Sequence, residues 1–124
     1  MRRNTLVTCL VGAVLLGSGI AQTVISDSDI IEYDRRVAEK HKTVFPAAGV
    51  VPDAETAKSI VLAIATPIWG KDKVTSELPL RAGLKGNVWT VIGNPHLQGG
   101  ETGGELIIQL DKRTGAVLSL LHTQ

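Results

Sequence analysis

The chain has 124 residues, of which 13 are basic and 12 are acidic, and 44 % of its residues are hydrophobic. This length suits one domain with one modest hydrophobic core. The nearly neutral charge provides no attraction for nucleic acid or for an anionic membrane surface, so we expect neither class of partner.

The N-terminus has the pattern of a cleavable signal peptide. Two arginines precede an apolar stretch at residues 6–16, and the small residue Ala21 stands at a suitable cleavage position. We therefore predict a signal peptide over residues 1–21, a single domain over residues 22–124, and export to the periplasm without stable membrane insertion. An uncleaved anchor is the alternative, because the apolar segment is close to the shortest length that spans a bilayer.

The only cysteine, Cys9, lies inside the predicted signal peptide. Cleavage leaves the mature chain without a thiol, so neither disulfides nor cysteine-bound metal can hold its fold. The mature chain keeps 11 basic residues, the 13 of the whole chain less two in the signal peptide, against 12 acidic ones. Packing alone must therefore stabilise the fold.

Two helices are predicted in the first half of the mature chain. The first begins near Ile30, ends at residues 41–43 and has a narrow apolar stripe, so we expect it to pack at an edge. The second has the clearest start signal, because Asp53 can accept amide hydrogen bonds as its N-cap. Its wide apolar face predicts the main core helix, which Pro67 should kink or end. That face consists of Ala57, Ile60, Val61, Ile64 and Ile68.

From residue 74 onward the hydrophobic period changes from helical to two, which indicates strands. In the first strand, Leu80 should face the core and Glu77 should face solvent. A hairpin turn at residues 85–87 leads to the second strand. Three strands are predicted at residues 88–93, 105–110 and 116–122, with a glycine-rich loop at residues 94–104 and a turn at residues 111–115.

The order of these elements indicates an α+β fold, with two N-terminal helices packed on a curved antiparallel sheet of three to four strands. Ile64 and Trp89 lie on apolar faces that should meet, so we predict that they sit together where the second helix crosses the hairpin.

The mature sequence offers few groups for catalysis. Its histidines, His41, His96 and His122, lack the spacing of a metal site, so we expect no metal and no cofactor. Glu101 and Glu105 flank two glycines and can be interpreted as an acid–base pair or as solvated residues. We expect solvated residues, and therefore no enzymatic activity.

Several short segments in the second half of the chain resemble a known family. They are residues 51–57, 67–70, 78–79 and 84–89, Val91, Gly93, Gly103-Gly104, Ile108, Asp111-Lys112 and Thr114-Gly115. Their order and spacing resemble the immunity proteins of bacterial toxin systems that have the nuclear transport factor 2 (NTF2) fold. The resemblance implies an NTF2-like domain that binds and neutralises a cognate toxin and is not an enzyme. With the export signal, it implies a toxin that acts in the periplasm, such as a cell-wall hydrolase.

Two other functions stay open on the sequence alone. One is a periplasmic PepSY-like module that modulates proteases, since such modules end in a similar hairpin. The other is an NTF2-like domain that binds a small molecule. The identity of the toxin and the oligomeric state do not follow from the sequence.

The resemblance brings no fixed functional residues, so the binding site is predicted from the loop at residues 94–104. It is the longest connection between strands, and binding groups concentrate on loops that a rigid sheet holds. We predict that the toxin contacts four of its side chains, with an exposed sheet face as the alternative. The four side chains are His96, Leu97, Gln98 and Glu101, and the sheet face lies around Arg81, Thr90 and Gln109.

Overall fold

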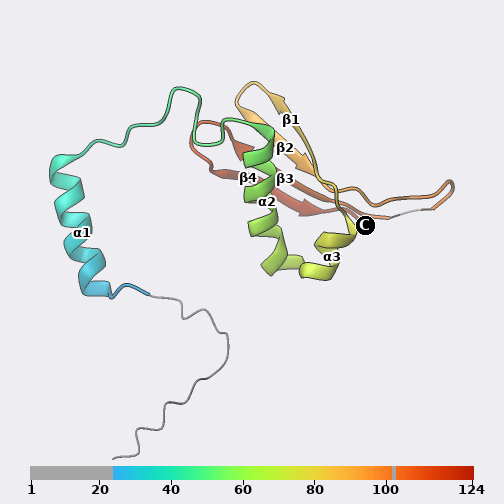
Figure 1. Cartoon of the computed structure of the whole chain (residues 1–124), viewed down its shortest axis with the longest axis horizontal. Helices are drawn as coiled ribbons and strands as arrows, with labels where there is room; N and C mark the ends of the chain where they lie inside the picture. Colours follow the sequence, from blue (N-terminus) through green and yellow to red (C-terminus); the bar gives the residue numbers. More distant parts are fainter. Residues whose placement is uncertain (1–23, 102) are drawn as a thin grey trace, which may run out of the picture. The chain divides into compact units, whose positions relative to one another are not determined.

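The computed structural model describes residues 24–101 and 103–124, so the predicted signal peptide lies outside the described residues (Figure 1). Helices are followed by a four-stranded antiparallel sheet, which confirms the predicted α+β class. The described residues fall into two compact units that divide after Lys42.

The first unit contains helix α1 (Asp27–Lys40), none of whose residues is buried. The helix begins three residues before the predicted start, because Ser26 acts as its N-cap and accepts a hydrogen bond from the Asp29 amide at 3.2 Å. On its surface, Glu32 forms ion pairs with Arg35 at 3.1 Å and with Arg36 at 2.8 Å.

The second unit begins with helix α2 (Ala54–Trp69), whose predicted N-cap is confirmed. The Asp53 side chain accepts a hydrogen bond from the Thr56 amide at 2.8 Å, which holds the pKa of Asp53 below its ordinary value of 3.8. Pro67 lies in the last turn of α2, and the helix ends at Gly70, which has a φ of 89°. Glycine adopts this positive φ without steric cost, so it suits the point where one helix stops and the next begins.

The segment after Gly70 differs from the prediction. Residues expected at the start of a strand instead form helix α3 (Lys71–Ser76), and strand β1 begins only at Arg81. Glu77, expected on a solvent-facing surface, is only 2 % exposed, because partners from distant strands bind its carboxylate. A six-residue helix is too short to show a periodicity that distinguishes it from a strand.

The sheet is a meander of four strands in the order β1-β2-β3-β4 (Figure 1). Both tight turns were predicted correctly, and each has a glycine with positive φ, Gly86 at 60° and Gly115 at 77°. A register shift between Gln109 and Leu110 marks an irregularity in the pairing of the last two strands. The strands are β1 (Arg81–Lys85), β2 (Val88–Ile92), β3 (Leu106–Asp111) and β4 (Val117–His122).

Helix α2 packs on one face of the sheet and contacts β1, β2 and β3. Trp89 is buried there, and its indole Nε1 donates a hydrogen bond to the Val51 carbonyl at 2.9 Å. Ile64 packs against the cluster that contains Trp89, and direct contact between these two side chains stays a prediction. The buried core consists of Val51, Ala57, Val61, Ala65, Val74, Leu80, Trp89, Val91, Leu106, Ile108 and Leu110.

One predicted core position is wrong, since Ile68 is 51 % exposed. The buried stripe of α2 recurs every four residues at Ala57, Val61 and Ala65, so its next member is Trp69, which is partly buried against the core. Ile68 directly precedes Trp69 and therefore lies beside this stripe. The small alanines let the helix approach the sheet closely.

Candidate functional site

The segment between β2 and β3 projects beyond the end of the sheet, and we call residues 94–104 the arm (Figure 1). A turn forms its tip, where the Glu101 amide donates to the Gln98 carbonyl at 3.0 Å and Gly100 has a φ of 86°. The Glu101 carboxylate accepts a further hydrogen bond from the Gln98 amide at 2.9 Å. Two of the predicted binding residues therefore stabilise the turn at the tip.

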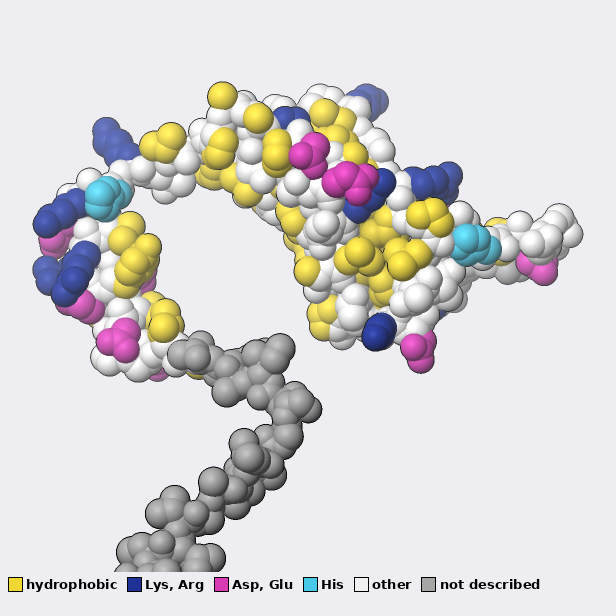
Figure 2. All heavy atoms as spheres, viewed as in Figure 1, with side chains coloured by type: hydrophobic (Ala, Val, Ile, Leu, Met, Phe, Trp, Pro, Cys, Tyr) yellow, Lys and Arg dark blue, Asp and Glu magenta, His cyan; other side chains and the backbone are white. Residues whose placement is uncertain are grey.

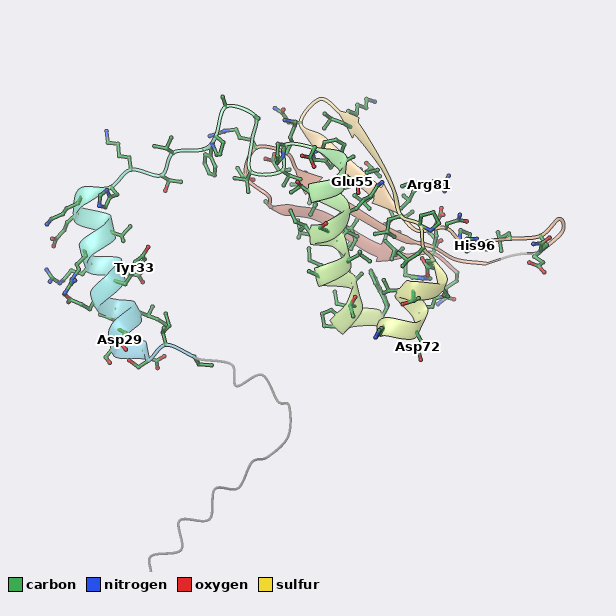
Figure 3. All side chains as sticks on the ribbon, viewed as in Figure 1. Asp29, Tyr33, Glu55, Asp72, Arg81 and His96 are labelled. Carbon is green, nitrogen blue, oxygen red and sulfur yellow. The ribbon has the colours of Figure 1, made fainter. Side chains whose placement is uncertain are left out.

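His96 lies at the base of the arm (Figure 3). It has a φ of 52°, its amide donates to the Asn94 side chain at 3.0 Å, and its imidazole Nε2 contacts the carbonyl of Leu78. Leu97 is 46 % exposed on the arm. The four predicted residues therefore do not form one cluster, because His96 belongs to the base while Gln98 and Glu101 belong to the tip. Figure 2 shows a histidine where the arm leaves the body of the domain.

Both ends of the arm are bound to Glu77. Its backbone carbonyl accepts a hydrogen bond from the Asn94 amide at 2.7 Å, at the first residue of the arm, and its carboxylate Oε2 accepts one from the Leu106 amide at 2.8 Å, just after the arm. A Cβ atom at Gly93 would lie 2.2 Å from Oε2, so only glycine leaves room for the carboxylate. We call this arrangement the Glu77 clamp.

The other carboxylate oxygen of Glu77 binds His122, the last residue of β4. Nε2 of His122 lies 2.6 Å from Oε1, and Nδ1 of the same ring lies 2.7 Å from the Thr123 carbonyl. A carboxylate and a carbonyl are both acceptors, so each ring nitrogen of His122 lies against an acceptor oxygen. The Trp69 ring packs beside it at a centroid distance of 5.6 Å, and Lys73 Nζ lies 3.5 Å from Oε1 of Glu77.

The surroundings of Glu77 favour its charged form. Burial by itself raises the pKa of this carboxyl, but the Leu106 amide, His122 and Lys73 together outweigh burial and hold the pKa below its ordinary value of 4.5. Each carboxylate oxygen is engaged by protein groups, so the clamp is suited to positioning the arm. The sequence gives no local signal for it, since Leu106 and His122 lie 29 and 45 residues from Glu77.

The sheet face opposite α2 is the alternative binding surface. Gln109 Nε2 donates to the Thr90 hydroxyl there at 3.1 Å. Beside this pair, a shallow groove of about 610 Å³ is lined by Lys85, Gly86, Val88, Thr90, Gln109 and Leu118.

The part of the chain that the structure describes shows neither a metal-binding cluster nor a helix that could span a membrane. Residues 24–101 and 103–124 contain no group of three or more metal-ligating side chains arranged to hold a metal ion. Among these same residues, no helix combines the length and the apolar character needed to cross a bilayer.

The fold is that of a small α+β domain in which α2 packs on a four-stranded antiparallel meander. The connection between the two central strands projects from the domain as the clamped arm. The model of the NTF2 fold immunity protein family matches residues 56–124, more than half of the chain, and the chain belongs to this family. The match confirms the resemblance and supports an immunity function over the PepSY-like alternative. It also favours a role in binding a toxin over one in catalysis. No curated protein and no solved structure matches the chain.

Proposed function

We propose that this protein is an exported immunity protein that binds a cognate toxin through its arm. The toxin acts in the periplasm, and a cell-wall hydrolase is the leading class. Family membership supports the immunity function. One observation carries the assignment to the arm. Its exposed tip is held at both ends by one buried residue, Glu77, which uses its backbone carbonyl at one end and its carboxylate at the other.

The composition of the arm suits entry into a cleft of the toxin. Glycine makes up four of its residues, which keeps the arm narrow and allows a partner to approach its backbone closely. Leu97 offers a half-exposed apolar side chain, and Gln98 and Glu101 offer polar groups near the tip. Because the clamp and the tip turn already order the arm, binding costs less conformational entropy than it would for a free loop.

The first experiment identifies the partner and then removes the arm's side chains. The tagged chain is used to capture its partner from the native host, and mass spectrometry identifies that protein. The arm variant combines Leu97→Ala with Gln98→Ala, which leaves the Glu77 clamp intact. We expect its melting temperature to change by less than about 3 °C, while affinity for the captured protein falls at least about tenfold, as for a binding hot spot.

The matched control combines Arg81→Ala with Thr90→Ala on the sheet face. We expect this control to keep both its affinity and its protection of cells that express the captured toxin, whereas the arm variant loses protection. The reverse result, with a protective arm variant and an unprotective sheet variant, would move the binding site to the sheet face. A further variant, Glu101→Ala, then tests whether the tip turn itself is required.

The proposed compartment has its own test. Cleavage after Ala21 makes Gln22 the first residue of the exported protein, as the small residues of Gly19-Ile20-Ala21 indicate. The intact mass of the protein in a periplasmic extract decides this point. A mass that includes residues 1–21 contradicts cleavage, and a protein found only in the membrane fraction supports the anchor.

A further inference from the structure

Strand β4 exposes large apolar side chains on both of its faces. Successive residues such as Leu120 and Leu121 point to opposite sides of the sheet, and these two are 41 % and 42 % exposed. Val117 and Leu118 are similarly exposed, at 47 % and 52 %. Among the described residues, α2 packs along the other three strands and meets β4 only at its end, where Trp69 lies beside His122. The last strand is therefore an edge that α2 leaves mostly uncovered.

The two edges of the sheet differ in charge. Edge strand β1 carries Arg81 and Lys85, and Pro79 lies just before it. Charged residues and proline are the usual means by which proteins prevent edge strands from pairing with other chains. Strand β4 has none of these protections, since its one titratable side chain, His122, is bound to Glu77.

We propose that β4 pairs with the β4 strand of a second copy of this chain, in antiparallel orientation, so that two four-stranded sheets become one continuous sheet. The sequence of β4 suits pairing with itself, because four of its six residues are large and apolar and the pairing brings no like charges together. Pairing through β1 would instead bring Arg81 and Lys85 of the two copies near each other. A two-fold axis makes the contact isologous, as in most homodimers.

The size of the contact sets the expected strength of the dimer. Stable complexes bury about 800 Å² on each partner. A six-residue strand with four half-exposed side chains offers less than this, so the dimer should be weak and reversible. We expect mainly monomer in dilute solution and a growing fraction of dimer as the concentration rises. This inference is independent of the proposed function, since it is tested without any toxin.

The test is sedimentation velocity of the full exported chain over a wide concentration range. For the wild type, we expect the average mass to rise with concentration toward twice the monomer mass. Leu121→Lys places a charge on β4 and should keep the chain monomeric at every concentration. The matched control is Leu84→Lys on β1, because Leu84 is 45 % exposed and its strand is already charged. This control should dimerise like the wild type.

Hydrogen exchange of the wild-type chain keeps the inference testable if the Leu121→Lys variant fails to fold. Amides of β4 that point away from β3 should gain protection as the protein concentration rises, while those of β1 should not. A wild-type chain that stays monomeric at all concentrations overturns the proposal, as does equal loss of dimer in both lysine variants. If the wild type is monomeric and the Leu121→Lys variant no longer protects cells against the toxin, β4 is a toxin-binding surface, and this result also overturns the dimer proposal.

Discussion

Replacing Glu77 with alanine should destabilise the domain strongly, although the side chain lies outside the apolar core. The change removes the carboxylate that accepts the Leu106 amide at 2.8 Å and that pairs with His122 at 2.6 Å. Breaking a buried charge pair by removing one partner costs about 3 to 5 kcal/mol. In a domain of this size, that cost corresponds to a fall in melting temperature of about 15 °C or more. Urea denaturation at neutral pH, followed by tryptophan fluorescence, measures the loss in the free energy of unfolding.

The pH dependence of the free energy of unfolding distinguishes the contribution of the Glu77 charge from that of its packing. Because the pKa of Glu77 in the folded state lies below 4.5, its contribution to stability is fully present above pH 4.5 and is lost as the pH falls through the folded value. Glu77→Gln keeps the shape and one acceptor oxygen but cannot ionise. We expect the free energy of unfolding to fall more steeply between pH 5 and 3 for the wild type than for Glu77→Gln.

The control for this prediction is Glu55→Ala. The Glu55 side chain is 84 % exposed and pairs with Lys58 at 2.9 Å, so its removal should cost about 0.5 kcal/mol or less. If Glu77→Ala costs as little as Glu55→Ala, or if the wild type and Glu77→Gln have parallel pH profiles, the clamp does not stabilise the fold through its charge.

Two further changes test other contacts in the same domain. Trp89→Phe removes the hydrogen bond to the Val51 carbonyl and leaves a buried acceptor unpaired, so urea denaturation should show a loss of about 1 to 3 kcal/mol. Gly104→Ala places a Cβ atom 1.6 Å from the Thr123 carbonyl oxygen, so the end of β4 must move and the melting temperature should fall by several degrees. Gly99→Ala, which meets no atom within 4 Å, should leave the melting temperature unchanged within about 2 °C.

The features that the sequence predicted well depend on interactions between neighbouring residues. Asp53 caps α2 through Thr56, three residues away, and the turn at Asp111 is closed by Thr114 and Gly115 in the same way. Such contacts follow from residue type and spacing, so the start of α2 and both hairpin turns were correct. The α+β class then follows from the order of the elements.

The features that the sequence missed depend on contacts between distant residues. Nothing near Glu77 indicates burial, because its partners come from β3 and β4, and the short α3 helix before it has no distinctive period. The exposure of Ile68 likewise depends on which side of α2 the sheet takes. The residues predicted to contact the toxin stay a prediction, although the structure now divides them between the base and the tip of the arm.

The Glu77 clamp also affects how the arm can change during evolution. Its hydrogen bonds join Glu77 to Asn94 and Leu106, and they leave the tip outside the network that stabilises the sheet. Substitutions, insertions and deletions at the tip, around residues 98–101, therefore alter the arm without removing a contact of the core, and lengthening a loop costs little entropy. The same domain can consequently carry arms of different length and sequence, each matched to a different toxin.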